Sequence, residues 1–372
     1  MINKKMQKRI FFGSIMLAIL GGLFTFDYRN YFDQIKNKTH TTPAFESLSN
    51  VFSTITDPAW LVTGLLVLLL VLGFVELRKM LKNIDIDIHP VSGIFGTIFF
   101  ALFASGWVNK FLLANINCYA NCLKSDSAMQ AGGQLASKAA MLNPLTINFS
   151  IVFLFVVIAV FLEQMIRGRL IKALERISGT LLGILWLGLG GAMILSIRLD
   201  FGPSYLIIFL IATKSTDIGA YFTGSMIGKH KMIPWLSPGK SWEGLVGGLL
   251  FSGIVSVVLS KYLGLDISYF RETSSGVGAQ SATLTSFIQA GPGTVFWAIF
   301  GMVCGLTGQL GDLCESLIKR STKVKDSASL IPEFGGVLDL IDSPLIASAF
   351  GLALLSIWSF IGNFDKVLNL VS

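Results

Sequence analysis

Nine apolar segments, each close to the length of a membrane-crossing helix, constrain the fold more than any other feature of the chain. A helix needs about 20 mostly apolar residues to cross the hydrocarbon core of a bilayer. The segments cover residues 10–26, 60–75, 91–108, 147–162, 177–197, 205–220, 245–263, 294–310 and 344–361. Only 14% of the 372 residues are charged and 53% are apolar, whereas a soluble domain has about 25% charged and about 45–50% apolar residues. We therefore predict an all-α, polytopic integral membrane protein with about nine transmembrane helices, which excludes soluble enzymes, disordered scaffolds and small disulfide-stapled domains.

The Lys and Arg residues predict how these helices are oriented. If the N-terminus lies inside the cell, most of the 29 basic residues fall in inside segments, such as 4–9, 167–176 and 319–325. Basic residues are enriched on the cytoplasmic side of membrane proteins, so we expect an N-in/C-out chain of the cell (inner) membrane whose first segment is an uncleaved signal anchor. The net charge of +7 has the same cause, and nucleic acid is therefore not an expected partner.

The polar residues divide the chain into two predicted regions. Residues 1–200 are typical of scaffold helices joined by long outside loops, 27–59 and 109–146, which are rich in Ser, Thr, Asn and Gly. Cys118 and Cys122 lie in the second loop, where either two thiols or one structural disulfide fits the sequence. Residues 201–372 carry polar motifs at the cytoplasmic ends of their apolar segments, and we predict that this region is the catalytic transmembrane domain.

The sixth apolar segment contains an acidic residue where a bilayer disfavours one. A charged side chain at membrane depth costs at least about 2.5–3.5 kcal/mol on insertion scales, and Asp217 lies near the cytoplasmic end of this segment. Lys214 stands three residues earlier on the same helical face, so the two charges could neutralise each other. The alternative is that both residues line a polar cavity that opens to the cytoplasm.

The inside loop that follows combines a lysine with a predicted helix start. Ser241 is placed to cap a helix whose first turn contains Trp242 and Glu243. Lys240 and this helix N-terminus would together attract an anion such as a phosphate. The simpler interpretation is an interfacial Trp surrounded by lysines that extend toward water.

The densest polar region follows the eighth apolar segment. Asp312, Glu315, Ser316 and Lys319 share one face of a helix, and Asp339 and Asp342 share a face of a second helix. The pair Gly335-Gly336 allows backbone amides to approach a ligand closely. Mg²⁺ prefers a few carboxylates together with phosphate oxygens, and lysines suit the remaining phosphate charge. The region therefore predicts a site that brings a nucleoside triphosphate to another phosphate, and the alternative is a solvated, salt-bridged loop.

These motifs carry a family resemblance over about residues 205–350. The acidic region resembles the signature of phosphatidate cytidylyltransferases, also called CDP-diacylglycerol synthases, in the order Ser316-x-x-Lys319-Arg320-x₄-Lys325-Asp326, then Pro332-x-x-Gly335-Gly336-x-x-Asp339-x-x-Asp342. The earlier block, with Tyr221, Gly228-Lys229-His230-Lys231, Ser237-Pro238 and Lys240-Ser241-Trp242-Glu243-Gly244, is similar to the family's other shared block. The chain departs from the family pattern at Ser225, Gly239, Glu333, Phe334 and Leu340, where the family usually has Arg, Lys, Gly, His and Arg.

The resemblance implies an activity and a set of residues. The implied enzyme is a nucleotidyltransferase of phospholipid biosynthesis that converts CTP and phosphatidate into CDP-diacylglycerol and pyrophosphate. The implied cofactor is Mg²⁺, as one ion or as a pair about 3.5–4 Å apart, with Asp312, Glu315 and Asp339 as ligands. The implied catalytic residues are Asp312, Asp339, Lys319, Asp326 and Asp342. The implied substrate-binding residues are Asp217, Ser237, Lys240, Trp242, Glu243, Ser316, Arg320, Lys325, Gly335 and Gly336. The expected partners are CTP, phosphatidate with the surrounding membrane lipid, and a second copy of the chain in a homodimer.

Three other classes of protein remain open at this point. A polyprenol kinase or a synthase that uses an ether-linked lipid phosphate would handle similar chemistry. A transporter or channel would need charges near the middle of several helices, whereas the first three apolar segments are nearly free of charge. A membrane-bound interaction protein derived from an enzyme is favoured only by the departures at Phe334 and Leu340.

Overall fold

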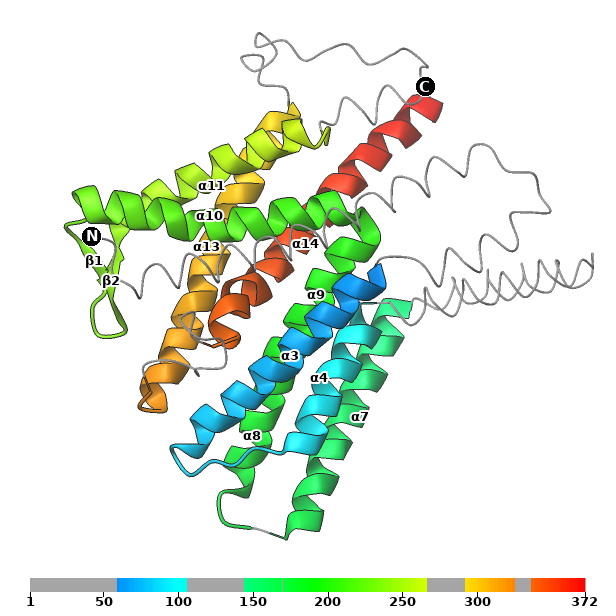
Figure 1. Cartoon of the computed structure of the whole chain (residues 1–372). Coiled ribbons are helices and arrows are strands. Elements are labelled where there is room, and N and C mark those ends of the chain that lie inside the picture. Colours follow the sequence, from blue (N-terminus) through cyan, green and yellow to red (C-terminus); the bar gives the residue numbers. More distant parts are fainter. Residues whose placement is uncertain (1–58, 106–143, 169, 266–291, 325–335, 372) are drawn as a thin grey trace, which may run out of the picture. The chain divides into compact units, whose positions relative to one another are not determined.

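The computed structural model describes residues 59–105, 144–168, 170–265, 292–324 and 336–371, and nearly all of its regular structure is helical (Figure 1). The elements are α3 (Ala59–Lys82), α4 (Pro90–Ala104), α7 (Pro144–Arg167), α8 (Ala173–Gly183), η1 (Ile184–Leu189), α9 (Gly190–Ser196), η2 (Ile197–Phe201), α10 (Pro203–Ile227), β1 (Lys231–Ile233), β2 (Ser237–Ser241), α11 (Trp242–Tyr262), α13 (Pro292–Ser321) and α14 (Leu338–Val371). The described residues depart from the all-α prediction only at the antiparallel hairpin of β1 and β2.

The described residues include six helical stretches that are long and apolar enough to cross a membrane. They are Trp60–Lys82, Ala173–Phe201, Pro203–Ile227, Trp242–Tyr262, Gly293–Ser321 and Leu338–Ser359. The predicted segments 91–108 and 147–162 coincide with α4 and α7, and α4 is shorter, with 15 residues. The segment 10–26 lies outside the described residues. The protein is therefore a polytopic membrane protein, while the number nine and the N-in/C-out orientation stay predictions.

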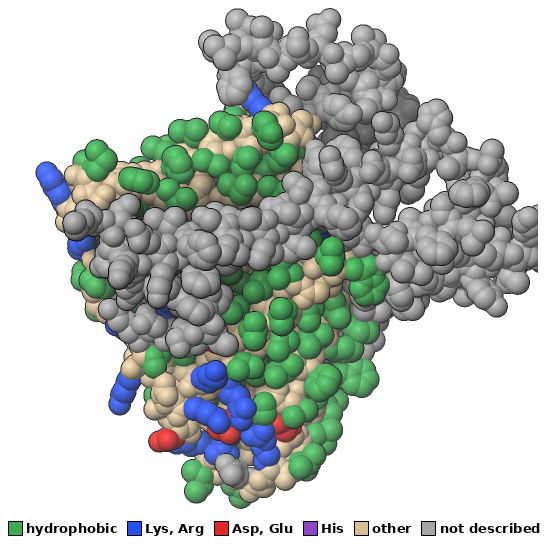
Figure 2. Space-filling model, in the orientation of Figure 1, with side chains coloured by type: hydrophobic (Ala, Val, Ile, Leu, Met, Phe, Trp, Pro, Cys, Tyr) green, Lys and Arg blue, Asp and Glu red, His purple; other side chains and the backbone are tan. Residues whose placement is uncertain are grey.

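Large apolar side chains on the helix surfaces fit contact with lipid. Phe95 on α4, Leu154 and Phe155 on α7 and Ile254 on α11 are all exposed. Figure 2 shows green, hydrophobic side chains along the sides of the described helices, with Lys and Arg gathered at helix ends. The bilayer core holds no water to bond the backbone N–H and C=O groups, and a helix is stable there because its own hydrogen bonds satisfy these groups.

The residues cluster in two compact units, and the first contains α3, α4, α7 and the run from α8 to η2. It comprises Met1–Pro203 together with Ser321–Ile341. The run from Ala173 to Phe201 includes two π-helical stretches, η1 and η2, and it ends at Gly202, whose φ of 100° is accessible to glycine and rarely to other residues. α4 lies close to α3, because a Cβ at Gly93 would come within 1.9 Å of the Phe74 ring.

The second unit contains the hairpin and most of α10, α11, α13 and α14. It comprises Ser204–Arg320 and Asp342–Ser372, so α14 begins in the first unit and continues into the second. The buried Ser252 hydroxyl of α11 lies 2.8 Å from the carbonyl oxygens of both Ala212 in α10 and Gly301 in α13. These contacts hold α11 against two neighbouring helices. The assignment of scaffold and catalytic roles to residues 1–200 and 201–372 stays a prediction.

Two of the four cysteines are described. Cys304 is buried in α13 and Cys314 is exposed on the same helix, and both are free thiols. Cys118 and Cys122 lie outside the described residues, and their disulfide stays a prediction.

Candidate active site

Three carboxylates of the second unit converge from two helices. α13 carries Asp312 and Glu315, and α14 carries Asp342. One oxygen from each of the three side chains lies within 4.8 Å of the others. Glu315 is 1% exposed and Asp342 is 2% exposed, whereas Asp312 is half-buried. We call Asp312, Glu315 and Asp342 the carboxylate triad.

A glycine makes this convergence possible. α13 and α14 approach so closely beside the triad that a Cβ at Gly311 would lie 2.5 Å from the carbonyl oxygen of Asp342. Any other residue at Gly311 would push the helices apart and separate Asp312 from Asp342. The Asp342 carboxylate is held in turn by its neighbour, because its Oδ1 accepts hydrogen bonds from the Ser343 backbone N–H at 2.6 Å and from the Ser343 hydroxyl at 3.1 Å.

Each carboxylate of the triad faces one lysine. Lys240 Nζ in β2 lies 2.5 Å from Asp312 Oδ2, and Lys319 Nζ in α13 lies 2.7 Å from Glu315 Oε2. Lys214 Nζ in α10 lies 3.9 Å from Asp342 Oδ1. Three elements thus supply one cation each, which compensates carboxylates that would be costly to bury as isolated charges.

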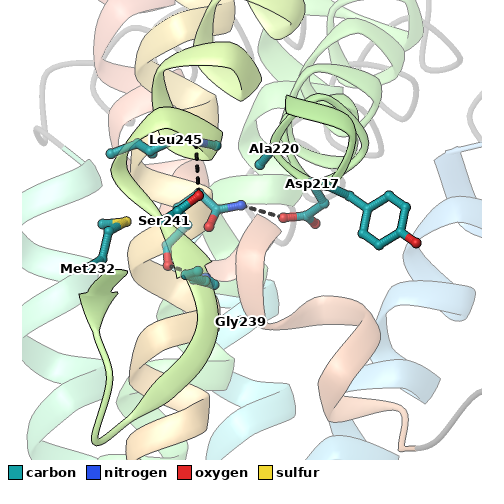
Figure 3. Close-up of a pocket in the computed structure, with 10 residues that line it drawn as sticks. Asp217, Ala220, Met232, Gly239, Ser241 and Leu245 are labelled. Carbon is teal, nitrogen blue, oxygen red and sulfur yellow. Dashed lines mark hydrogen bonds between the residues drawn. The ribbon is translucent and has the colours of Figure 1, made fainter. Parts of the chain in front are cut away.

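A cavity of about 250 Å³ is lined in part by Lys240, which also contacts Asp312 of the triad; Figure 3 shows the residues of this lining. Its lining comprises Asp217, Ala220, Tyr221, Met232, Gly239, Lys240, Ser241, Gly244, Leu245 and Gln309. The Gln309 side chain donates a 2.6 Å hydrogen bond from Nε2 to Asp217 Oδ1, drawn as a dashed line in Figure 3. The Gln309 carbonyl oxygen also accepts a hydrogen bond from Lys240 Nζ at 3.4 Å. Lys240 therefore borders both the cavity and the triad.

The structure gives Asp217 and Lys214 different direct contacts. Lys214 contacts Asp342 on another helix, and Asp217 accepts its hydrogen bond from Gln309 and lines the cavity. Asp217 therefore lines a cavity, whereas Lys214 is not among the lining residues, and the opening of this cavity to the cytoplasm stays a prediction. Sequence reasoning missed Gln309, although an amide side chain near the end of an apolar segment, three residues before Asp312, is itself a signal of a polar site.

The base of the hairpin that carries Lys240 is held by contacts between His230 and Glu243, which we call the clamp. His230 Nδ1 lies 2.5 Å from Glu243 Oε1, and the His230 backbone N–H lies 3.2 Å from both oxygens of that carboxylate. The Trp242 backbone N–H donates to the His230 carbonyl oxygen at 3.0 Å. Ser241 caps α11 by accepting a 3.2 Å hydrogen bond from Gly244 N–H, which confirms the predicted cap. Lys240 thus lies near the end of β2, in a hairpin that the clamp holds at its base and that leads directly into the capped helix α11.

The other predicted site residues fall into three groups: residues of the second unit, residues of the first unit, and residues outside the described ranges. Ser237 begins β2, Trp242 and Glu243 form the first turn of α11, and Ser316 is half-buried on α13. Arg320 Nε donates to the Leu236 carbonyl oxygen of the hairpin turn at 3.5 Å. Asp339 and the buried Gly336 belong to the first unit, where the Gly336 N–H donates to Asp339 Oδ2 at 2.9 Å. Lys325, Asp326 and Gly335 lie outside the described residues.

The fold and the site together define a polytopic membrane protein in which a small cavity, lined by Asp217 and Lys240 among mostly apolar residues, lies next to a group of three carboxylates and their lysines. A profile of the cytidylyltransferase family matches residues 134–358. That match includes the cavity and the whole triad and covers more than half of the chain, and the protein belongs to the cytidylyltransferase family.

Similar proteins carry a more specific name. The chain is similar to the phosphatidate cytidylyltransferase of Haemophilus influenzae, with 38% identity over 149 residues, which are 40% of this chain and 44% of that protein. It shares 31% identity over 160 residues with that of Bacillus subtilis, covering 43% of this chain and 50% of the relative. With the phosphatidate cytidylyltransferase of Staphylococcus aureus it shares 34% identity over 165 residues, which are 44% of this chain and 53% of that protein. The match spans about half the length of these relatives.

Proposed function

We propose that the protein is a phosphatidate cytidylyltransferase, which joins CTP and phosphatidate into CDP-diacylglycerol and releases pyrophosphate. The observation that carries this proposal is the position of Lys240, which lines the cavity and also contacts Asp312 of the triad. An elongated anionic ligand that starts in the cavity therefore passes a cation and reaches the carboxylates. The names of the similar proteins support the same substrate pair.

The triad fits a divalent cation that binds phosphates. Mg²⁺ is bound by one or two carboxylates together with substrate phosphate oxygens, and the triad offers three carboxylate oxygens within 4.8 Å of one another. We propose that Asp312, Glu315 and Asp342 are the ligands of this ion. The metal role of Asp339 and a second ion, both predicted from the sequence, are further parts of the proposal. When bound, the ion would neutralise charge on the triphosphate and polarise its phosphorus–oxygen bonds.

The protein's own residues then act by positioning and charge. Asp217 and Gln309 offer an acceptor and a donor to the polar groups of a nucleotide in the cavity, and Lys240 and Lys319 neutralise phosphate charge. A phosphatidate oxygen attacks the α-phosphorus of CTP, the bond from that phosphorus to the β-phosphate bridging oxygen breaks, and pyrophosphate leaves. This step needs no covalent enzyme intermediate, because such transfers depend mainly on alignment and charge neutralisation.

The membrane location fits the lipid substrate. The polar side chains belong to helix ends and to a hairpin between two candidate spans, Pro203–Ile227 and Trp242–Tyr262. A phospholipid can keep its acyl chains in the bilayer while its phosphate reaches such a site. We propose that this side faces the cytoplasm, where CTP is available, as the distribution of Lys and Arg predicts.

The decisive experiment supplies purified protein with labelled CTP, Mg²⁺ and phosphatidate and looks for a labelled CDP-lipid together with pyrophosphate. Parallel reactions replace phosphatidate with dolichol, with an ether-linked lipid phosphate or with no lipid. A CDP-lipid formed only with phosphatidate supports the proposal. A phosphorylated polyprenol or a product only from the ether lipid would assign the nearest rival activity, and no product from any lipid would overturn the proposed enzyme.

A further inference from the structure

Glu76 is a fully buried carboxylate on α3, far in sequence from all the polar motifs of the site. It is 0% exposed and lies within the candidate span Trp60–Lys82. Ionisable residues inside membrane spans are costly and are kept where they have a defined partner. The partners of Glu76 are two backbone N–H groups at the start of α14, 261 and 262 residues along the chain.

The contact is made by both carboxylate oxygens. Val337 N–H donates to Oε1 at 2.9 Å, and Leu338 N–H donates to Oε2 at 2.8 Å. The first N–H groups of a helix have no partner inside the helix, and a negative charge at this end also interacts favourably with the helix dipole. Glu76 therefore acts as the N-terminal cap of α14 from another helix.

The sequence at the start of α14 explains why an outside cap is needed. An ordinary cap is a Ser, Thr, Asp or Asn immediately before the first helical residue, and α14 has Val337 at that position. The preceding Gly336 N–H is satisfied by Asp339 Oδ2 at 2.9 Å. Two carboxylates thus hold three consecutive amides, and one of these carboxylates is the predicted catalytic Asp339.

Packing supports the same attachment. Gly73 precedes Glu76 by three residues on α3, and a Cβ there would lie 3.1 Å from the Ile341 side chain and 3.6 Å from the Leu338 side chain. The small residue lets α3 and the first turn of α14 lie close enough for the hydrogen bonds of Glu76. Val337, Leu338 and Ile341 are all buried.

We propose that Glu76 is a positioning residue that fixes the segment from Gly336 to Leu338 and the orientation of Asp339. A local cap would stabilise α14, but it would not fix the first turn against α3, whereas Glu76 does both. The catalytic effect of Glu76 rests on the proposed function, since the anchored segment belongs to the motif Gly335-Gly336-x-x-Asp339 of the predicted site. A misplacement of about 1 Å can lower a rate about a hundredfold.

The experiment compares Glu76→Ala, Glu76→Gln and Glu76→Asp with the matched control Asp85→Asn, which removes an exposed negative charge just beyond α3. Hydrogen–deuterium exchange of residues 336–341 is measured in lipid nanodiscs, together with kcat and KM for CTP. In Glu76→Ala we expect about tenfold faster exchange in this segment and kcat lowered about tenfold or more, with KM for CTP changed less than twofold. Glu76→Asp keeps two acceptor oxygens and should recover part of both losses, Glu76→Gln should recover less, and the control should match the unmodified protein.

Two results would overturn the proposal. Unchanged exchange at residues 336–341 in Glu76→Ala would remove the anchoring role. Faster exchange with unchanged kcat would remove the catalytic positioning role. If the unmodified protein makes no CDP-lipid, the proposed function fails by itself, and the exchange measurement still decides whether Glu76 anchors α14.

Discussion

Asp312 is the member of the triad that links the buried carboxylates to the cavity, because its Oδ2 contacts Lys240, which lines the cavity. Replacing it by Asn keeps its size and removes its charge. We expect Asp312→Asn to lower the rate of CDP-lipid formation at least about a hundredfold, since the proposed Mg²⁺ would lose a charged ligand and would then offset less of the charge on the reacting phosphates. The measurement is turnover of labelled CTP by equal amounts of purified protein.

Cys314 provides the matched control for Asp312→Asn. It lies on the same turn of α13, but its side chain is exposed and the triad does not include it. Cys314→Ser should therefore retain near-normal turnover. If Asp312→Asn is as active as Cys314→Ser, the triad is not the reaction centre.

His89 adds a pH-dependent contribution to the stability of the first unit. It is 0% exposed, and burial holds the pKa of its imidazole below the ordinary value, against the opposing effect of Glu163. The unfolded chain binds a proton at His89 as the pH falls through about 6.5, while the folded chain binds this proton only at a lower pH. The contribution of the neutral His89 to the stability of the folded state is thus fully present above this pH and is lost as the pH decreases.

We therefore expect the thermal unfolding midpoint to fall by a few degrees between pH 7.5 and pH 5.5. His89→Gln cannot titrate, so this variant should show a flatter dependence over the same interval. Burial acts to raise the pKa of Glu163, but the hydrogen bond from Ser92 N–H and the charge of Arg167 outweigh it and hold this pKa below its ordinary value. The contribution of Glu163 to the stability is therefore unchanged between pH 7.5 and pH 5.5. Parallel pH curves for the two proteins would assign the effect to another group.

At the scale of elements, the clamp between His230 and Glu243 keeps the hairpin closed and thereby places Lys240. Glu243→Ala removes the carboxylate that accepts the hydrogen bond of the His230 backbone N–H and contacts the His230 ring. We expect KM for CTP to increase several-fold, because Lys240 would spend less time beside the cavity. Steady-state kinetics with varied CTP at saturating phosphatidate measures this change.

A double-mutant cycle identifies the clamp as the cause. Glu243→Gln keeps one acceptor oxygen for the backbone N–H and should raise KM less than Glu243→Ala does. His230→Ala should have little further effect when Glu243 is already Ala, because residues that share one interaction are not additive. Fully additive changes in KM would indicate separate contacts of His230 and Glu243 with the substrate.

The elements themselves were predictable to different degrees. Apolar segments predicted the helices well, since eight of the nine coincide with described helices, and Ser241 correctly marked the start of α11. The hairpin was missed because residues 231–241 contain two prolines and a glycine, which favour a loop in any local assignment. Its pairing depends on the clamp and on contacts of the following helix, and neither is encoded by the alternation of residues in the strands.

At the scale of the molecule, helical spacing predicts which residues share a face, but it does not predict which helices become neighbours. Asp312 and Glu315 were grouped from their spacing, and the structure adds Asp342 beside them and a lysine from α10. Glu76 lies one residue beyond the predicted segment 60–75 and reads as an interfacial charge. Its role depends on a contact across more than 260 residues, and no local pattern contains that information.

The orientation of the chain in the membrane is the last property that the proposed reaction requires. In the proposed reaction CTP comes from the cytoplasm, so the hairpin must face the cytoplasm, and residues 264–293, which follow the candidate span Trp242–Tyr262, are expected on the opposite side as an outside loop. Single cysteines report these positions in a chain whose four native cysteines are changed to Ser. We expect Pro238→Cys, at an exposed position of β2, to react with a membrane-impermeant maleimide only in inside-out vesicles.

Ser275→Cys, within the predicted outside loop, should react only in right-side-out vesicles. The two positions are separated by α11, one of the candidate spans, so opposite labelling follows if that helix crosses the bilayer once. Labelling of both cysteines from the same side would mean that α11 does not span the membrane. Opposite labelling in the reversed sense would place the carboxylate triad away from CTP, and the proposed reaction could not then occur at this site in the cell.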